Sequence, residues 1–91
     1  MNANQLKLII ENKLKLETIS FVSSTDDVHF NATIISDAFE GIASKLKQQK
    51  IVYGIIQEYI TSGEIHAITM KTYNFQQWKK RINSDGDLDK R

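Results

Sequence analysis

Two short runs of alternating side chains do most to limit the folds that this chain can adopt. The first, HFNATIIS, covers residues 29–36, and the second, EIHAITMK, covers residues 64–71. Alternation of apolar residues with other residues is typical of strands that bury one face. Between the two runs, apolar residues recur at helical spacing over residues 44–60. This change of period predicts mixed α+β structure.

The remaining segments complete a predicted order of αββααβα. Helical spacing predicts a helix over 4–14, and β-branched and aromatic residues predict a strand over 16–22. A short polar loop joins this strand to the next one, as in an antiparallel hairpin. A single helical turn within 37–41 and a short helix within 73–82 account for the rest. The predicted fold is a two-layer α+β sandwich with a three-stranded sheet and all helices on one face.

The chain is long enough for one hydrophobic core. With 91 residues it predicts a single domain over 1–81, followed by a flexible polar tail over 82–91. Within the long helix, Gln48 is expected on a polar face, and Gly54 suggests close packing because Gly lowers helix stability by up to about 1 kcal/mol relative to Ala. The residues expected on the apolar face of this helix are Ile42, Leu46, Tyr53, Ile56, Tyr59 and Ile60.

Composition excludes several classes of protein. Without cysteine, the chain has no disulfides, no thiolate nucleophile and no Cys-ligated metal site of its own. Because the net charge is only +1, the chain as a whole does not attract polyanions strongly, and any binding of nucleic acid would depend on a local basic patch. No apolar run approaches the roughly 18 residues that span a bilayer, so a cytoplasmic protein without a membrane partner is expected. The G-x-S-x-G, P-loop and H-E-x-x-H motifs are all missing, and we do not expect an enzyme.

The only two histidines, His29 and His66, stand near the beginnings of the two alternating runs. A single His in such a position is more often structural than a ligand. Neutral imidazole is nevertheless a good ligand for iron, zinc or copper. Two imidazoles leave a metal under-coordinated, and only Asp26 and Asp27 lie close by in the sequence to add oxygen, so a private zinc site is not expected.

Basic residues near the beginning of the long helix and near the end of the last helix are a second candidate site, for phosphate contacts. A charge run of this size is usually a solvated face, so we rank DNA contact below the histidine hypothesis. The candidate residues are Lys45, Lys47, Lys50, Lys79, Lys80 and Arg81.

Three stretches of the sequence, HFNATIISDAFEG, KQQKIVYG and IHAITMKTYNFQQW, resemble the BolA family. The family pattern runs roughly H-F-x-V-x-I-V-S-x-x-F-x-G, then R-H-R-x-V-Y, then I-H-A-L-x-x-x-T-x-T-P-x-E-W. The resemblance covers residues 6–78, and KQQ followed by VYG is most similar to the IbaG (YrbA) branch. It implies a fold similar to a class II KH domain, in agreement with the predicted order.

The resemblance also implies a function. BolA-like proteins pair with monothiol glutaredoxins and share a [2Fe–2S] cluster that a glutaredoxin Cys and a glutathione thiolate hold on the other side. The His of I-H-A, the family's cluster ligand, corresponds to His66. His29 is the remaining candidate for the second ligand, although some branches carry a Cys several residues earlier, around Asp26. The implied role is cluster trafficking or sensing of iron, redox state or stress, with no cofactor in the isolated protein.

Some family members are DNA-binding transcriptional regulators, which is the alternative that the resemblance offers. This chain departs from the pattern where R-H-R is replaced by Gln48, Gln49 and Lys50, and it lacks the G-x-x-G loop with which KH domains clamp a nucleic-acid backbone. Phe75 stands where the family has Pro, which is expected to alter the entry to the last helix. These departures weaken the DNA alternative.

Overall fold

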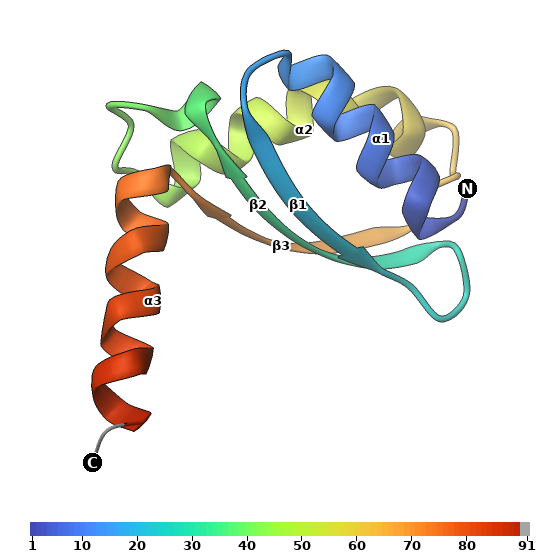
Figure 1. Ribbon diagram of the computed structural model, residues 1–91. Coiled ribbons are helices and arrows are strands. Elements are labelled where there is room, and N and C mark those ends of the chain that lie inside the picture. The colour runs from blue at the N-terminus through green and yellow to red at the C-terminus, as the bar shows by residue number, and fades with distance from the viewer. Residues whose placement is uncertain (90–91) are drawn as a thin grey trace.

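The computed structural model describes the backbone of residues 1–89 and the side chains of residues 1–83, and its elements follow the predicted order (Figure 1). The predicted α+β class is confirmed. None of the helices within residues 1–89 is both long enough and apolar enough to cross a bilayer. The elements are α1 (Ala3–Leu14), β1 (Thr18–Ser23), β2 (His29–Ser36), the 3-10 turn η1 (Asp37–Phe39), α2 (Lys45–Thr61), β3 (Ala67–Tyr73) and α3 (Phe75–Asp89).

The sheet has the strand order β1-β2-β3 and is mixed. β1 and β2 form the predicted antiparallel hairpin, with Phe21 opposite Thr33, whereas β2 and β3 are parallel, with His29 opposite Ala67. The segment that contains α2 makes the long crossover that a parallel pair requires. Parallel pairing places the beginnings of β2 and β3 at the same end of the sheet.

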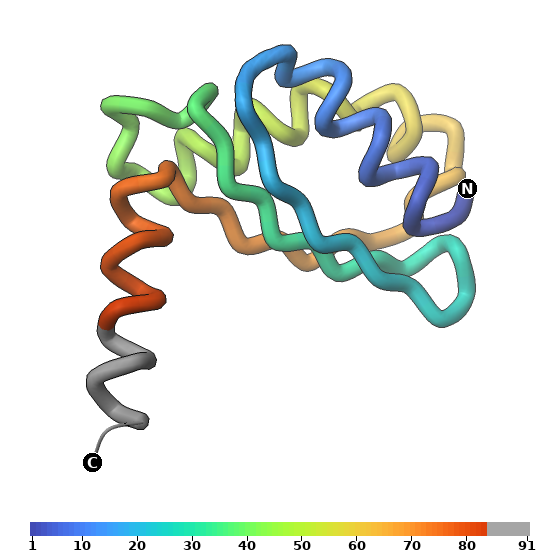
Figure 2. Tube along the Cα trace, viewed as in Figure 1, coloured from blue at the N-terminus to red at the C-terminus, as the bar shows by residue number. Residues whose placement is uncertain are grey.

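Helices α1 and α2 cover one face of the sheet and bury the core there (Figures 1 and 2). Alternate residues of β2 and β3 point toward the core, and α1 and α2 contribute the apolar side chains of their inward faces. The fold therefore leaves the opposite face of the sheet without a helical layer over most of its length. The buried apolar cluster comprises Leu6, Ile10, Leu14, Phe30, Ala32, Ile34, Phe39, Val52, Ile56, Ile65 and Met70.

Local signals explain where the helices begin. The Asn2 side chain accepts a hydrogen bond from the backbone N–H of Gln5, and the Gln5 side chain accepts one from the backbone N–H of Asn2, as in a capping box. Ser44 caps α2 through the N–H of Lys47. Gly41, with φ of 75°, takes the left-handed conformation that ends η1.

The buried stripe of α2 differs from the predicted one. Leu46 is 63% exposed, whereas Gln48 is completely buried. Gln48 lies on the inward face of α2, one helical turn before the buried Val52. Gln48 Nε2 donates to the Ile42 carbonyl oxygen at 2.7 Å and to Gln77 Oε1 at 2.8 Å, whereas its buried Oε1 has no hydrogen-bond partner among the described residues. The prediction for Gly54 is also wrong, because a Cβ added there would meet no atom within 4 Å.

Helix α3 departs from the predicted helical layer. Trp78 packs against Tyr73 of β3 and Phe21 of β1, with ring centroids 5.3 and 6.5 Å apart, and both strand residues lie on the face away from α1 and α2. Ile35 points to this same face and is fully buried there, which gives α3 an apolar row to cover.

Helix α3 is also longer than predicted. It continues to Asp89, beyond the expected beginning of a tail at residue 82, and the segment contains no Pro that would stop it. Residues 90–91 of the predicted tail lie outside the described residues, as do the side chains from residue 84 onward.

Candidate metal-ligand site

The two histidines lie side by side at one end of the sheet. His29 is the first residue of β2, and His66 directly precedes β3, which runs parallel to β2. Their ring centroids are 5.8 Å apart, and the ring planes meet at 85°. The N–H of His66 donates to the carbonyl oxygen of Val28 at 2.8 Å, which ties the beginnings of the two strands together. Both imidazole rings belong to exposed residues.

One carboxylate organises the loop before β2. Asp26 Oδ1 accepts hydrogen bonds from the backbone N–H groups of Val28 and His29, at 3.1 and 2.8 Å, and Oδ2 accepts from Nδ1 of the His29 ring at 2.7 Å. The backbone N–H groups of His29 and Val28, and then the His29 ring, hold the pKa of Asp26 well below its usual range. A proton on Nδ1 leaves the lone pair of Nε2 free for a ligand or metal.

The two acidic residues of the loop, Asp26 and Asp27, differ in what their carboxylates contact. Both oxygens of Asp26 are engaged in holding the loop and His29, so Asp26 acts as a support for the ring. Asp27 sits at a backbone φ of 63°, and its side chain forms no hydrogen bond or ion pair with the residues that the structure describes. Sequence patterns do not distinguish these neighbours, because the difference arises from the turn geometry.

The ring of His66 has no comparable support. Within residues 1–83, no side chain forms a hydrogen bond or ion pair with it, and its contact with His29 is the edge-to-face one. Nor do those residues contain any group of three or more His, Asp or Glu side chains that could hold a metal ion. Among the described side chains, the site thus offers two nitrogen donors.

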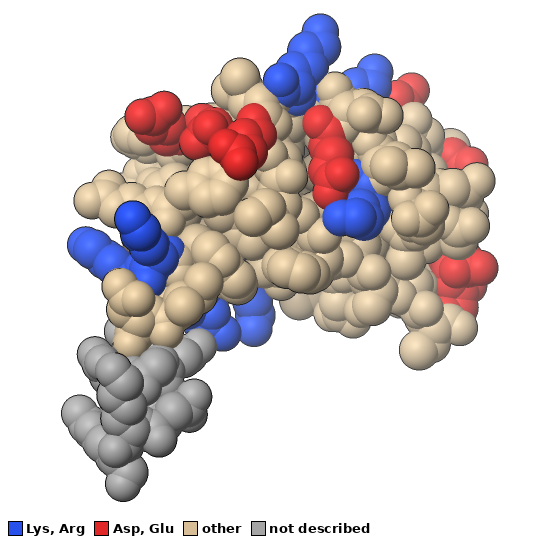
Figure 3. Space-filling view, in the orientation of Figure 1, with Lys and Arg blue, Asp and Glu red and all other residues tan. Residues whose placement is uncertain are grey.

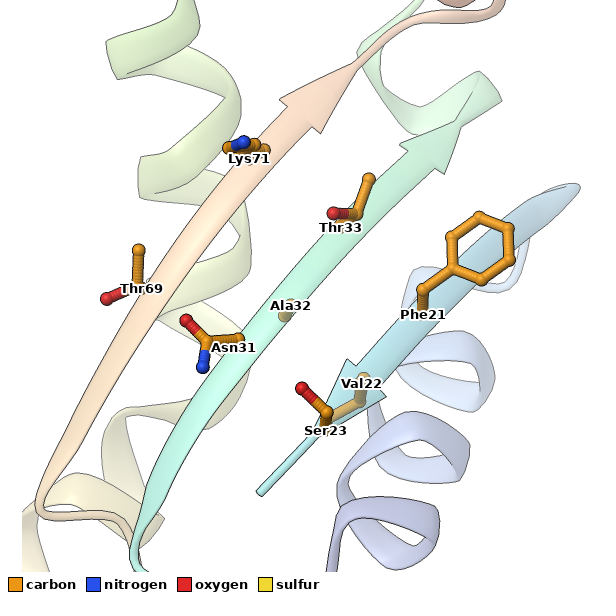
Figure 4. Close-up of a pocket in the computed structure, with 8 residues that line it drawn as sticks. All are labelled: Phe21, Val22, Ser23, Asn31, Ala32, Thr33, Thr69 and Lys71. Atoms are coloured by element: carbon orange, nitrogen blue, oxygen red, sulfur yellow. The ribbon is translucent and has the colours of Figure 1, made fainter. Parts of the chain in front are cut away.

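Rows of side chains that cross all three strands occupy the open face of the sheet beyond His29. Two of these rows, Ser23–Asn31–Thr69 and Phe21–Thr33–Lys71, line a shallow hollow. Val22 and Ala32 point away from the viewer in Figure 4. Phe21 is 57% exposed. Sequence analysis missed this surface, because alternation identifies the buried face of a strand and says little about the other.

The predicted basic residues do not form one patch. Lys45 Nζ lies 3.8 Å from the centre of the Tyr73 ring and donates to the carbonyl oxygen of Thr72, and the Arg81 guanidinium carbon lies 5.7 Å from the same ring. Burial, and then the charge of Arg81, lower the pKa of Lys45. Lys45, Tyr73 and Arg81 line a hollow at the β3 edge of the sheet, and Lys71, which is not among the predicted basic residues, lines it as well.

The other four predicted cations, Lys47, Lys50, Lys79 and Lys80, are exposed. They form no ion pair with the side chains described. Figure 3 shows Lys and Arg side chains beside the beginning of α3.

Comparison with known proteins identifies the family. Residues 3–77 match the family described as BolA-like protein. The chain belongs to the BolA family. It is 32% identical over 86 residues to the acid stress protein IbaG of Escherichia coli strain K12, covering 94% of this chain and 99% of that protein, which supports the IbaG branch. An uncharacterized protein of Buchnera aphidicola from Baizongia pistaciae is 36% identical over 78 residues, or 86% of this chain and 95% of the relative.

Solved structures agree with this BolA fold. A BolA protein homologue from Coxiella burnetii superposes with a TM-score of 0.71 at 26% identity, over 87% of this chain and 97% of that one. The BolA domain of SufE1 from Arabidopsis thaliana gives a TM-score of 0.66 at 27% identity, over 78% of this chain and 88% of that one.

Proposed function

We propose that this BolA protein binds a monothiol glutaredoxin and co-ligates a [2Fe–2S] cluster with it through His66 and His29. The observation that carries the proposal is the adjacency of the two exposed imidazoles, 5.8 Å apart between centroids, at the beginnings of two parallel strands. This pair is a concentrated source of nitrogen ligands, and the chain holds no third histidine.

The donor set fits one half of such a cluster. A [2Fe–2S] cluster is held by four ligands, and two of them are imidazoles in the Rieske type. This chain has two imidazoles and no cysteine, so the two thiolates would come from the glutaredoxin and from glutathione. When bound, a cluster with two neutral imidazoles in place of two thiolates carries less negative charge, which raises its reduction potential.

The residues of this chain would share the work of holding the cluster. His29 would offer Nε2, because Asp26 occupies the Nδ1 side of its ring. His66 would offer a ring that no side chain holds, so its orientation would be set on binding. Protons compete with iron for imidazole nitrogens, so acid should loosen this side of the cluster.

That acid sensitivity is in keeping with the name of the Escherichia coli relative, an acid stress protein. We propose a non-enzymatic role in the cytoplasm, where thiols stay reduced, in cluster trafficking or in sensing iron, redox state or stress. The DNA-binding alternative has weaker support, because only Lys45 and Arg81 of the six predicted cations share a contact, the Tyr73 ring.

The test is to add the protein to a monothiol glutaredoxin that carries a glutathione-ligated [2Fe–2S] cluster, and to record the visible absorption and circular dichroism. The wild-type chain should change the spectrum, and His66→Ala should abolish the change. Lys13→Gln, an exposed substitution on α1, is the control. A wild-type mixture with an unaltered spectrum, or a His66→Ala mixture identical to wild type, would refute the proposal.

A further inference from the structure

The open face of the sheet carries a second surface, separate from the histidine pair. A hollow on this face adjoins a second hollow at the β3 edge of the sheet, and the two share Lys71. The first is lined mainly by Phe21 and by hydroxyl and amide side chains. The second is lined also by Lys45 and Gln49 of α2, by Met70, Thr72 and Tyr73 of β3, and by Arg81 of α3. Figure 4 shows the first hollow, with Phe21, Asn31, Thr33, Thr69 and Lys71 projecting from three neighbouring strands on the same side.

The charge of this surface is of one sign. Lys45, Lys71 and Arg81 line it, and no Asp or Glu among the described side chains does. Lys45 and Arg81 both approach the Tyr73 ring, and the positive charge of Arg81 contributes to the lowered pKa of Lys45. Cations held this close without a described carboxylate between them favour an anionic ligand.

The shape and the aromatic residue limit the kind of anion. Phe21 is 57% exposed beside the polar side chains of the hollow, and Trp78 supports it from α3 at 6.5 Å between ring centroids. An exposed ring beside cations is the arrangement on which bases of single-stranded nucleic acids stack while their phosphates meet Lys and Arg. From Ser23 to the row of Tyr73 the face extends over four strand residues, about 13 Å.

The hydroxyl and amide side chains favour RNA over DNA. Ser23, Thr33 and Thr69 offer hydroxyl groups, and Asn31 offers an amide, along the path between Phe21 and the His29 end. Such groups can donate to and accept from a ribose 2′-OH, the group by which proteins distinguish RNA from DNA. We infer that this open face binds single-stranded RNA, with a base stacked on Phe21 and phosphates at Lys71 and Arg81.

The site is independent of the proposed cluster function, because neither His66 nor its ring partners line it. It also differs from the G-x-x-G mode of KH domains, which this chain lacks. The ligand would meet the side of the sheet opposite α1 and α2, with Arg81 of α3 at one end.

The experiment measures the fluorescence anisotropy of a labelled oligouridine about eight nucleotides long, a length within single-strand site sizes, over a series of salt concentrations. Affinity should fall with salt, and Lys71→Gln should reduce the slope by about 0.7, the value for one phosphate contact. Phe21→Leu should weaken binding by roughly fivefold or more, since stacking on the ring is lost. Lys13→Gln removes the same charge from α1 and should leave binding unchanged.

Competitors and mapping complete the test. Oligodeoxyuridine and a duplex RNA should compete poorly, and amide resonances of Asn31, Thr33, Thr69 and Lys71 should shift on titration of the wild-type protein, whether or not the variants fold. Equal competition by the DNA strand, the duplex or polyglutamate would overturn the assignment to single-stranded RNA. So would resonance shifts confined to α1 and α2, or the absence of binding at low salt.

Discussion

The two ends of the sheet carry opposite chemistry on the same strands. Where β2 and β3 begin, two imidazole rings lie together and a carboxylate, Asp26, supports one of them. Where these strands end, cations and aromatic rings gather around Tyr73, with no described carboxylate among the residues that line the hollow. The first end suits a metal that accepts nitrogen ligands, and the second suits an anion. Because β2 and β3 are parallel, the length of this strand pair separates the histidine end from the cationic end.

The largest expected effect tests whether the two ends act separately. The double variant His29→Ala/His66→Ala should lose all ability to alter the spectrum of the glutaredoxin cluster, because it has no histidine left to donate. Its binding of oligouridine should be unchanged. Spectroscopic titration and anisotropy on the same preparation check both outcomes, and loss of both activities together would mean that the ends are not independent.

Within the histidine end, Asp26→Ala should lower the affinity for the shared cluster by about 10–100-fold, the usual effect of removing a partner that orients a ligand histidine. The matched control is Asp27→Ala, which removes a neighbouring carboxylate that forms no described hydrogen bond. Titration of both variants against the glutaredoxin cluster measures the difference. Equal losses in the two variants would attribute the effect to charge and not to orientation of His29.

At the other end, the attachment of α3 depends partly on a buried amide. Gln48→Ala should lower the free energy of unfolding by about 1–3 kcal/mol, because a completely buried side chain is removed and the Ile42 carbonyl oxygen and Gln77 Oε1 each lose one donor, although Asn74 still donates to both. Gln57→Ala, at an exposed position of α2, should cost less than about 0.5 kcal/mol. Urea unfolding checks this pair, and similar losses would show that the network adds nothing.

The smallest effect concerns acid and lies away from both ends. Burial alone would raise the pKa of Glu11, but hydrogen bonds from Lys7 and Ser20 outweigh it and lower the pKa below its ordinary value of 4.5. A lowered pKa stabilises the fold above about pH 4.5, and this contribution is lost as the pH falls through the folded value.

Glu11→Gln should therefore lower the melting temperature slightly near neutrality and converge with wild type in acid, so that the loss of melting temperature below pH 4.5 is flatter in the variant. Protons compete with iron for the imidazole nitrogens, so acid should release the cluster from a protein that is still folded. Simultaneous loss of cluster and fold during one acid titration would contradict this separation.

Much of the fold could be predicted from periodicity and caps, and the failures have identifiable causes. The strand and helix periods specify the order of elements, and Asn2 and Ser44 mark the beginnings of α1 and α2. Helical spacing did not predict the inward position of Gln48, because its partners are a carbonyl and an amide that only the tertiary structure brings near. Leu46 lies outside the buried stripe for the same reason.

The site was predictable in part. The resemblance to the BolA family selects His66 and His29, but their adjacency depends on parallel pairing across an intervening helix. The support from Asp26 depends on a turn whose dihedral angles no motif specifies. Lys71 belongs with Lys45 and Arg81 only because β3, α2 and α3 converge at one end of the sheet.

The most direct test of the central proposal asks whether nitrogen from these rings binds iron. The chain would be labelled with ¹⁵N-histidine, combined with glutaredoxin, glutathione and the [2Fe–2S] cluster, reduced by one electron, and examined by electron–nuclear double resonance. We expect ¹⁵N hyperfine couplings from two directly bound imidazoles in the wild-type complex, and no such coupling in a mixture with His66→Ala. A reduced cluster in the wild-type complex without strong ¹⁵N coupling would contradict the proposal.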